Sequence, residues 1–398
     1  MSKRYPLVFF GDYWDIQWRR RQQLAWRLAK RDEVEHVLYV ESPLTLTSFV
    51  KFLLRKGDIS ARLRWRRTLQ NRSFSFNPGE GITVLSPLTI FPQTAIAPLF
   101  AFEMLIRKIV IRITVTRLMK RLDMKQPVVW VSLPTMVNWV PVARKLLWYD
   151  CTEDFSQWSW LPITVVKHIK DTDKLLTQKA DVISTVSVTL FDRKIASGKT
   201  LLLLPNGVDT ELFAKTGYGL PKEYEQFPSP RFVFVGMVNI RHDWALLLQT
   251  AKQRNNWNFV IIGNNHLDST MATSLSNQKN IHVLNAKKYE ELPAYLEHAD
   301  ACFQFYSDSA GNDTGDGQKI YLYLAAGKQV ISTPPAVSPS ARNFIRVVRT
   351  PSEMIANLEE CIGVTRVHSK ERVDAVNSSD WERRVDSIIA TINNSSTL

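Results

Sequence analysis

Cysteine is scarce in this chain. Its 398 residues include three cysteines, Cys151, Cys302 and Cys361, which are widely separated and form no Cys-x-x-Cys pair. Small disulfide-stapled domains contain more cysteines, and cysteine-based zinc sites contain closely spaced ones. The sequence therefore predicts a protein of a reducing compartment, without a disulfide framework and without a zinc site.

Long hydrophobic runs are also missing. The apolar run at residues 7–10 is too short for the core of a signal peptide. Residues 96–106, the longest mostly apolar stretch, contain Glu103 and supply about half of the ~20 residues that span a bilayer. We therefore expect a cytoplasmic protein whose contact with a membrane is peripheral, on the inner face.

Acidic residues are too few to balance the basic ones. The chain has 51 Lys and Arg against 38 Asp and Glu, a formal net charge of +13. Residues 1–200 hold 32 basic and 17 acidic side chains, net +15, which leaves the second half at net −2. The positive charge therefore belongs to the first half, whose surface we expect to attract an anionic partner.

Two segments of the first half, residues 51–72 and 96–121, interleave basic with apolar side chains. The first has eight basic residues against one acidic residue, Asp58. Basic helices with an apolar face bind anionic membranes, at about 1 kcal/mol per Lys or Arg near the surface. An amphipathic helix that packs its apolar face on the protein core and exposes its basic face to solvent shows the same pattern. Nucleic acid is a third candidate, but zinc-finger spacing, RNP-like motifs and basic-zipper heptads are missing from the sequence. We predict an anionic membrane surface as partner, and no nucleic acid.

Short apolar runs alternate with helical patterns along the chain, which is typical of βαβ units and parallel sheets. The runs lie at residues 7–10, 37–40, 128–131, 146–149, 182–186, 201–204, 232–235, 259–262, 281–283, 301–305 and 330–332. The predicted fold class is α/β, with two Rossmann-like doubly wound domains facing across a cleft at the carboxyl ends of their strands. Residues 220–230 contain three prolines and no periodicity, so they are predicted to connect the two domains.

Glycine follows two predicted strands of the second domain, as Gly236 and Gly263. Glycine permits close approach of the backbone, and the helix that begins after Gly236 offers unpaired N–H groups to a phosphate. Arg241, near the start of that helix, is a candidate second contact to a diphosphate. The alternative is that the glycines are simple turn residues and that Arg241 is solvated.

Three motifs together carry a resemblance to a known family. They are Trp-Tyr-Asp-Cys-Thr-Glu-Asp-Phe at residues 148–155, Leu-Pro-Asn-Gly-Val-Asp-Thr-Glu-Leu-Phe at 204–213, and Gly-Asp-Gly-Gln-Lys-Ile-Tyr-Leu-Tyr-Leu-Ala-Ala-Gly-Lys-Gln-Val-Ile-Ser-Thr at 315–333. In order and spacing the chain resembles GT-B glycosyltransferases of the family-4 type (glycosyl transferases group 1) from Asp12 to Trp381. The first motif resembles a subset that builds bacterial polysaccharides, including teichuronic-acid and xanthan-type glucuronosyltransferases.

The resemblance implies two domains with different ligands. Residues 1–205, completed by a C-terminal helix at 375–398, form an acceptor-binding domain, and residues 206–374 form the domain that binds the nucleotide-sugar donor. The second motif marks the crossing between them. The resemblance further implies a UDP-linked nucleotide sugar as co-substrate and no metal cofactor. In keeping with this, the sequence has no Asp-x-Asp at a strand end that would hold a divalent ion.

The third motif contains the predicted donor-binding residues. A Gly-Asp-Gly turn that opens a helix directs backbone N–H groups and the cation of Lys319 at a nucleotide diphosphate. We expect the donor to contact Asp316, Gly317, Gln318, Lys319 and Tyr321. The family has a Glu that accepts hydrogen bonds from the donor ribose, but Leu322 stands there and accepts none. Either another group holds the ribose, or the chain is a catalytically silent nucleotide-sugar-binding partner of a polysaccharide assembly complex.

Carboxylates at strand ends of the first domain are candidates for the base that an inverting transfer needs. Asp154 is the first candidate and Asp12 the second; the others are Asp15, Glu41, Asp150 and Glu153. For each of them, capping a helix is the alternative role.

Aromatic and cationic side chains after the first strand suit a sugar face and an acceptor phosphate, namely Trp14, Trp18, Arg19 and Arg20. We expect glycosyl transfer to a lipid-linked saccharide in bacterial surface or exported polysaccharide biosynthesis, with a soluble acceptor as the alternative.

Overall fold

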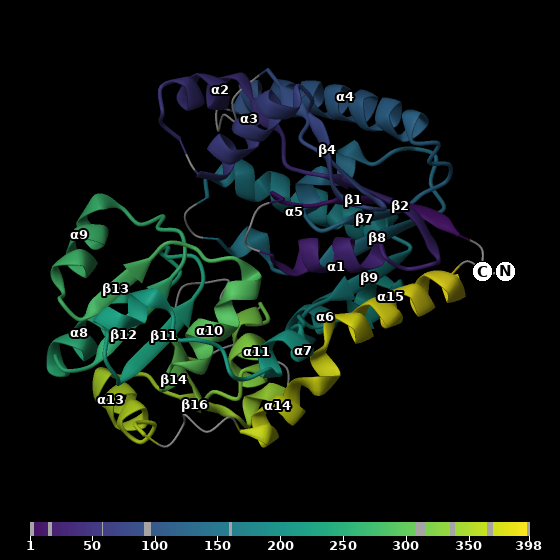
Figure 1. Cartoon of the computed structure of the whole chain (residues 1–398). Helices are drawn as coiled ribbons and strands as arrows, with labels where there is room; N and C mark the ends of the chain where they lie inside the picture. The colour runs from purple at the N-terminus through teal and green to yellow at the C-terminus, as the bar shows by residue number, and fades with distance from the viewer. Residues whose placement is uncertain are drawn as a thin grey trace. The chain divides into compact units, whose positions relative to one another are not determined.

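The structure is a computed structural model that describes residues 4–14, 18–57, 59–90, 97–158, 161–307, 315–334, 339–363 and 369–395. The chain folds into two compact units (Figure 1). Unit 1 comprises Met1–Leu204 and Val385–Leu398, and unit 2 comprises Pro205–Arg384. Residues 375–384, which were expected in the first domain, therefore belong to unit 2, and the crossing falls at the start of the second motif.

Unit 1 is built on an eight-stranded sheet with the strand order β10-β9-β8-β7-β1-β2-β5-β4. Its neighbouring strands are parallel except for β4 and β5, which pair antiparallel. A second, two-stranded sheet pairs β3 with β6. The elements of unit 1 are β1 (Tyr5–Phe10), α1 (Arg20–Leu28), β2 (Val34–Val40), β3 (Leu44–Thr45), α2 (Leu46–Leu53), α3 (Ile59–Asn71), β4 (Ser75–Gly79), β5 (Ile82–Leu85), β6 (Leu88–Thr89), α4 (Ala97–Arg121), β7 (Val128–Val131), η1 (Pro134–Trp139), β8 (Leu146–Cys151), η2 (Phe155–Gln157), α5 (Ile163–Lys179), β9 (Val182–Thr185), α6 (Val188–Lys194), η3 (Ile195–Ser197) and β10 (Thr200–Leu203).

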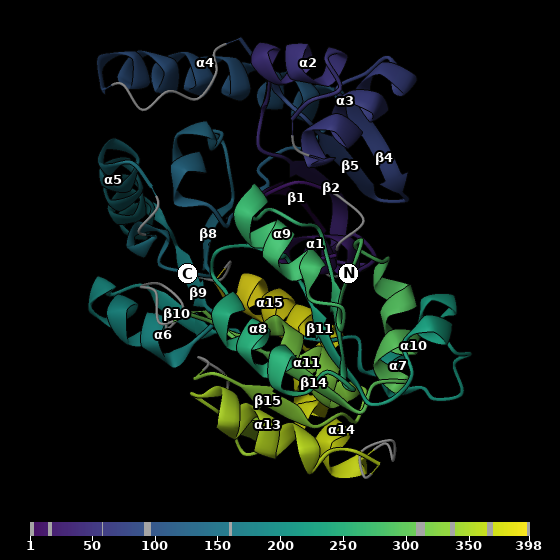
Figure 2. The same ribbon diagram turned by 90° about the vertical axis from the view of Figure 1, so that its left-hand side faces the viewer.

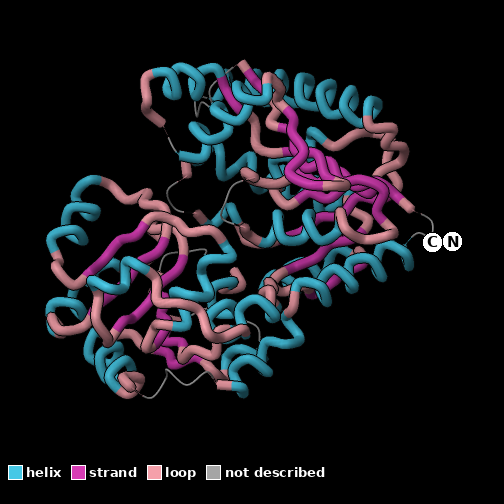
Figure 3. Tube along the Cα trace, in the orientation of Figure 1, coloured by secondary structure: helices cyan, strands magenta, loops and turns pink. Residues whose placement is uncertain are grey.

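Unit 2 has a six-stranded parallel sheet with the order β13-β12-β11-β14-β15-β16, which is the 3-2-1-4-5-6 order of Rossmann domains. Figure 3 shows the strands of each unit between helices. The elements of unit 2 are α7 (Thr210–Ala214), η4 (Lys222–Gln226), β11 (Arg231–Val235), α8 (Trp244–Gln253), β12 (Asn258–Ile262), α9 (Ser269–Asn277), β13 (Ile281–Leu284), η5 (Tyr289–Glu291), α10 (Leu292–Glu297), β14 (Ala301–Gln304), α11 (Gln318–Ala325), β15 (Val330–Ser332), α12 (Pro339–Arg342), β16 (Ile345–Val347), α13 (Pro351–Glu359), α14 (Lys370–Val376), η6 (Asn377–Ser379) and the first residues of α15 (Trp381–Ser395).

Each apolar run predicted as a strand is a strand, and the structure adds β3, β4, β5, β6 and β16. The prediction that residues 220–230 connect the domains is wrong. These residues lie within unit 2, where Tyr224 is 1% exposed and its hydroxyl donates to the carbonyl oxygen of Tyr295 at 3.1 Å. The prolines therefore lie in an ordered segment that packs on unit 2. The connection between the two units comes before this segment in the chain.

An aromatic stack crosses the centre of the unit 1 sheet. The rings of Tyr39, Phe9, Trp130 and Trp148, on four adjacent strands, follow one another at centroid distances of 5.5, 5.2 and 4.7 Å. Parallel strands buried on both faces need apolar residues at every position, and these rings fill one face. The other face packs on α4, α5 and α6 in a single apolar cluster.

The helices α2, α3 and α4 expose apolar side chains. Figures 1 and 2 show them together at one end of unit 1. Helix α2 buries none of its residues, although five of its eight are apolar. Helix α4 buries Ile111, Val115 and Met119, while its other face carries side chains that are 43–55% exposed, namely Leu99, Phe102, Leu105, Ile109 and Ile113. Among the described helices, none is both long and apolar enough to cross a bilayer.

Candidate functional site

The candidate donor site of unit 2 lies where the strand order reverses. Strand β11 has β12 on one side and β14 on the other, so the connections that leave β11 and β14 run in opposite directions. Ligands of doubly wound sheets bind at such a point, outside the carboxyl ends of the strands. Gly236 follows β11, Tyr306 comes shortly after β14, and Lys319 of α11 contacts both.

Lys319 is held by uncharged groups. Its Nζ lies 3.3 Å from the hydroxyl oxygen of Tyr306 and 3.5 Å from Nε2 of His242. It also lies 4.8 Å from the ring centroid of Phe234 and 5.0 Å from that of Tyr306. In the described part of the chain, no carboxylate pairs with this ammonium. Aromatic faces attract a cation without neutralising it, so its charge remains available to an anion. We call Phe234, Gly236, His242, Tyr306 and Lys319 the Lys319 cage.

Two glycines make this arrangement possible. A Cβ at Gly236, where φ is +152°, would lie 2.3 Å from Cε of Lys319, and a Cβ at Gly263 would lie 1.8 Å from the carbonyl oxygen of Gly236. Any side chain at Gly263 would therefore displace the loop that carries Gly236. The space beside both glycines is thus taken by Lys319 and by neighbouring backbone, and their contact with a donor stays a prediction.

Asp316 and Tyr321 fasten the loop before α11 to the start of unit 2. The Asp316 carboxylate accepts hydrogen bonds from the backbone N–H of Asn206 at 2.7 Å and from the hydroxyl of Tyr321 at 2.9 Å. Asp316 is 8% exposed and Tyr321 is fully buried. Their burial leaves little of either side chain to contact a donor, so the structure gives them a positioning role that the sequence did not indicate.

The remaining donor-side residues surround the first turn of α11. Gly317 caps this helix and Gln318 is its first residue, half-buried beside Lys319. The Arg241 guanidinium lies 6.0 Å from the ring centroid of Tyr306. Leu322, which replaces the family's Glu, is 6% exposed.

Four residues of this site were missed from the sequence: Phe234, His242, Gln304 and Tyr306. Gln304 ends β14, is 1% exposed, and its amide has no hydrogen-bond partner among the described residues. Their positions in the sequence could have identified them. His242 directly follows Arg241, and Gln304 and Tyr306 stand at the end of a predicted strand.

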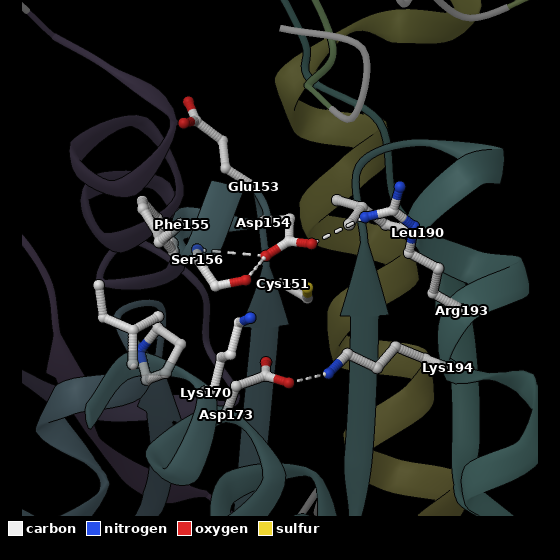
Figure 4. Close-up of a pocket in the computed structure, with 12 residues that line it drawn as sticks. Cys151, Glu153, Asp154, Phe155, Ser156, Lys170, Asp173, Leu190, Arg193 and Lys194 are labelled. Carbon is white, nitrogen blue, oxygen red and sulfur yellow. Dashed lines mark hydrogen bonds and ion pairs between the residues drawn. The ribbon is translucent and has the colours of Figure 1, made fainter. Parts of the chain in front are cut away.

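Unit 1 contains a cavity of about 290 Å³ beside the carboxyl end of β8 (Figure 4). Asp154, the first candidate base, lines it. Its carboxylate accepts hydrogen bonds from the Ser156 hydroxyl at 2.6 Å and backbone N–H at 3.2 Å, and pairs with Arg193 at 2.8 Å. Two further cations line the cavity: Lys194, which pairs with Asp173 at 2.6 Å, and the exposed Lys170. The cavity thus offers three carboxylates, of Glu153, Asp154 and Asp173, and three cations to a polar ligand.

Cys151 also lines the cavity. Burial raises the pKa of its thiol to about 12, so the thiol stays protonated and does not serve as a nucleophile at neutral pH. All three cysteines are buried and free. Among the described residues, no three His, Cys, Asp or Glu side chains gather where they could hold a metal ion.

The second candidate base, Asp12, has two cationic partners. It pairs with Arg21 at 2.9 Å and with Arg19 at 3.4 Å. Asp15 lies outside the described residues.

The predicted acceptor residues divide into two buried and two accessible side chains. Arg20 is 5% exposed and donates two hydrogen bonds to the buried carboxylate of Asp150, at 2.9 and 3.0 Å. Trp14 is 8% exposed and packs edge-on against Tyr39. Burial leaves these two little surface for an acceptor. Trp18 and Arg19 are half-buried and can still be reached.

Glu41, another strand-end carboxylate, is fully buried. It accepts hydrogen bonds from Arg64 at 3.2 Å and from Arg67 at 2.8 Å. Two cations of the basic segment 51–72 therefore point into unit 1, and only the remaining ones are available to an external anion.

Comparison with known proteins links this fold to glycosyltransferases. No protein-family model matches the chain. TuaH of Bacillus subtilis (strain 168), provisionally named a teichuronic acid biosynthesis glycosyltransferase, is 24% identical over 227 residues. That match covers 54% of this chain, which spans little more than half, 57%, of the length of TuaH.

Solved structures match almost the whole chain. Sucrose-phosphate synthase of Thermosynechococcus elongatus has a TM-score of 0.69 at 13% identity, over 98% of this chain and 99% of its own. Trehalose 6-phosphate synthase of Burkholderia multivorans has a TM-score of 0.65 at 11% identity, over 100% and 99%. HepE of Anabaena, solved with UDP and glucose, has a TM-score of 0.61 at 13% identity, over 97% and 98%. These likenesses confirm the predicted α/β class and show the GT-B fold.

We predict that His242 makes folding stability depend on pH. Burial first, and then the charge of Lys319, hold the pKa of His242 well below 6.5, so the imidazole is neutral and its Nε2 can accept from Lys319. Its contribution to stability is present above about pH 6.5 and is lost as the pH falls below that value, because the unfolded chain then binds the extra proton.

Urea unfolding between about pH 6.5 and pH 5 tests this. We expect His242→Phe, which keeps an aromatic ring, to reduce the slope of unfolding free energy against pH by up to about 1.4 kcal/mol per unit. Equal slopes in the parent and the variant would contradict the prediction.

Proposed function

We propose that this protein is a glycosyltransferase that moves a sugar from a nucleotide-sugar donor, UDP-linked, to a lipid-linked or polysaccharide acceptor in bacterial surface polysaccharide biosynthesis. The observation that carries the proposal is the Lys319 cage, an ammonium that pairs with no carboxylate of the described chain, at the switch point of a Rossmann sheet. The names of TuaH and of the HepE complex with UDP and glucose support the reaction class and the nucleotide.

The donor's diphosphate binds at the Lys319 cage. A glycosyl transfer leaves negative charge on the departing diphosphate, and a preplaced cation in a partly buried site stabilises that charge. Lys319 supplies the cation, and the backbone N–H groups at the first turn of α11 supply hydrogen bonds. In this proposal these groups replace a metal ion, so the reaction needs no metal cofactor.

The acceptor binds unit 1 at the cavity beside β8. Inversion at the sugar requires a base that removes the proton of the acceptor hydroxyl, and Asp154 is our candidate among the three carboxylates that line this cavity, the others being Glu153 and Asp173. Arg193 and Lys170 suit a phosphate or a carboxylate group on the acceptor. Retention would rely instead on the leaving-group contacts in unit 2.

The acceptor is presented at an anionic membrane surface on the cytoplasmic side. Helices α2, α3 and α4 carry exposed apolar side chains, and the basic segments 51–72 and 96–121 supply cations beside them. A face of this composition binds the interface of a bilayer that contains anionic lipid. The protein is then a peripheral membrane enzyme.

Leu322 favours one alternative function, a catalytically silent nucleotide-sugar-binding partner of a polysaccharide assembly complex. Its apolar side chain accepts no hydrogen bond from a ribose. This alternative predicts nucleotide binding without turnover.

Nucleotide binding is the first test. We expect UDP to raise the melting temperature of the purified protein, because a ligand that binds only the folded state stabilises it by about 2.7 kcal/mol at one hundred times its dissociation constant. Lys319→Ala removes the cation and abolishes the shift, while Lys279→Ala, which removes an exposed cation of the same unit, keeps it. GDP, dTDP and ADP are measured in the same way, so that the shifts show which nucleobase the site prefers. No shift with any of the four would refute both the enzyme and the silent partner.

Turnover tests the role of Asp154. We expect Asp154→Asn to lower kcat by about 10²–10⁴-fold, the usual contribution of a general base, with an unchanged UDP shift. The assay is release of UDP from UDP-sugars in the presence of detergent-solubilised lipid-linked saccharides. Asp171→Asn, an exposed carboxylate on α5, is the matched control. If Asp12→Asn lowers kcat and Asp154→Asn does not, the general base is Asp12. If the parent protein binds UDP without turnover, the silent partner is favoured.

Vesicle binding tests the membrane surface. We expect the protein to sediment with vesicles that contain anionic lipid at low salt, and to dissociate as salt screens the charges. Ile109→Asp places a charge on the exposed face of α4 and weakens binding. Ile195→Asp adds the same charge at an exposed site away from α2, α3 and α4, and leaves binding unchanged. Equal effects of the two variants would argue against the assigned face.

A further inference from the structure

We propose that His242 takes up a proton when a nucleoside diphosphate binds at the Lys319 cage, and that the resulting imidazolium is a second cation beside the diphosphate. This inference rests on the proposed function, which places the donor's diphosphate at the cage. It adds that the binding of the donor and of its product depends on pH. The observation behind it is that Nε2 of His242 and Nζ of Lys319 lie 3.5 Å apart.

The contacts of His242 indicate which of its ring nitrogens carries the hydrogen in the free protein. Nδ1 lies 3.4 Å from the carbonyl oxygen of Asn239, which is an acceptor, so Nδ1 is the protonated nitrogen. Nε2 is then unprotonated, and its neighbour is the ammonium of Lys319, which is a donor. The ring nitrogen that can bind a further proton therefore faces the cation of the cage.

Aromatic rings enclose the imidazole, which is 6% exposed. Their centroids lie 4.9 to 5.7 Å from that of His242, and the rings belong to Phe234, Tyr306, Phe305 and Trp244. Of these four neighbours, only the phenol of Tyr306 is titratable. A charged imidazole loses its hydration in such surroundings, so the free protein keeps the ring neutral.

The charged groups that act on the imidazole from the described part of the chain are cations. Burial first, then the charge of Lys319 and after it that of Arg241, hold the pKa of His242 well below 6.5. The adjacent carboxylate of Asp243 is engaged elsewhere, because it accepts a hydrogen bond from the backbone N–H of Leu246 and caps α8. In the free protein, the neighbouring charges therefore oppose protonation of this ring.

A diphosphate at the cage reverses this balance. An anionic oxygen that hydrogen-bonds to Nζ of Lys319 at about 2.8 Å lies at most about 6.3 Å from Nε2 of His242, the sum of the two distances. A negative charge in this range favours the protonated imidazole. Once Nε2 binds a proton from the solvent, it no longer accepts from Lys319, and the ammonium directs that hydrogen at the diphosphate instead.

Proton uptake favours the departing diphosphate over the intact donor. Breaking the bond to the sugar adds negative charge to the diphosphate, and the imidazolium of His242 attracts this added charge. Only interactions that are stronger in the transition state than in the ground state accelerate the chemical step. His242 thereby strengthens the stabilisation that Lys319 supplies, in a role that a permanently neutral side chain does not fill.

Calorimetry of UDP binding tests the proton uptake. Titrations near about pH 7 in Pipes and in Tris, whose heats of ionisation differ, give the number of protons that the complex gains. UDP can lose a proton of its own on binding, so the parent protein is compared with His242→Gln, whose polar side chain does not titrate. We expect the parent complex to gain more protons than the variant complex, by up to about one.

The affinity for UDP follows from the same linkage. Because the complex binds more protons than the free protein, the affinity of the parent relative to His242→Gln rises as the pH falls from about 8 to about 6.5, by up to about tenfold per unit. The matched control is His298→Gln. His298 is half-buried and precedes β14, at the opposite end of this strand from Tyr306, so its replacement keeps the proton count of the parent.

The imidazole resonances of the parent protein give a second measurement, which needs no folded variant. We expect one of the seven histidines to titrate well below pH 6.5 without UDP, and at least about one pH unit higher in the complex. If UDP binds but leaves every imidazole titration unchanged, or if the parent and a folded His242→Gln gain equal numbers of protons, the proton uptake is refuted and the donor site stands. If UDP does not bind the parent, the proposed donor site fails, and this inference fails with it.

Discussion

The carboxylate of Asp316 holds together segments of unit 2 that are far apart in the sequence. A buried carboxylate is costly unless donors surround it, and here the donors are the backbone of Asn206 and the hydroxyl of Tyr321. The backbone carbonyl of Asp316 also accepts from the Asn206 amide at 2.6 Å. These bonds fix the first residues of unit 2 against the first turn of α11. Because Lys319 lies one turn from Asp316, the position of the candidate donor site depends on this carboxylate.

The charged side chains at the strand ends of the two units have different partners. At the strand ends of unit 1, buried carboxylates and arginines satisfy one another, as Asp150 does with Arg20 and Glu41 with Arg64. Breaking such a pair leaves an uncompensated buried charge, which costs about 3–5 kcal/mol. Among the described residues of unit 2, the ammonium of Lys319 has aromatic rings, a neutral imidazole and a phenol around it and pairs with no carboxylate. Charges that pair internally stabilise the fold, whereas a cation left without a counterion favours a ligand that supplies one.

Much of the fold could be predicted from the sequence, because a parallel strand buried on both faces reads as an uninterrupted apolar run. Strand β5, Ile-Thr-Val-Leu, was missed although all four of its residues are buried, whereas other missed strands have weaker patterns. Strand β4 contains Asn77, Pro78 and Gly79, and β16 has three residues of which none is buried. The segment 220–230 was misread because prolines that order a loop against a core give the same signal as prolines in a linker.

The candidate site was only partly predictable, and the reason is sequence distance. Gly236 and Lys319 were found because each stands at a strand end or helix start that the sequence marks. His242 and Tyr306 were missed because their contact with Lys319 exists only once β11 and β14 lie side by side. Arg20 was assigned to an acceptor because its partner, Asp150, is 130 residues away. Sequence patterns locate the loops at a sheet edge, but they do not show which charged side chains in these loops form ion pairs with each other.

In the proposed membrane binding, the exposed face of α4 limits how strongly unit 1 holds a bilayer. Complete burial of a large aliphatic side chain contributes about 1.5–3 kcal/mol, and the five exposed residues of α4 already have about half of their surface covered. Their insertion therefore adds about 5 kcal/mol, comparable to a single myristoyl chain, which binds membranes only marginally and reversibly. Cations near the surface add about 1 kcal/mol each. Since neither contribution anchors a protein alone, the proposed attachment requires apolar and basic residues to act together, and it is reversible.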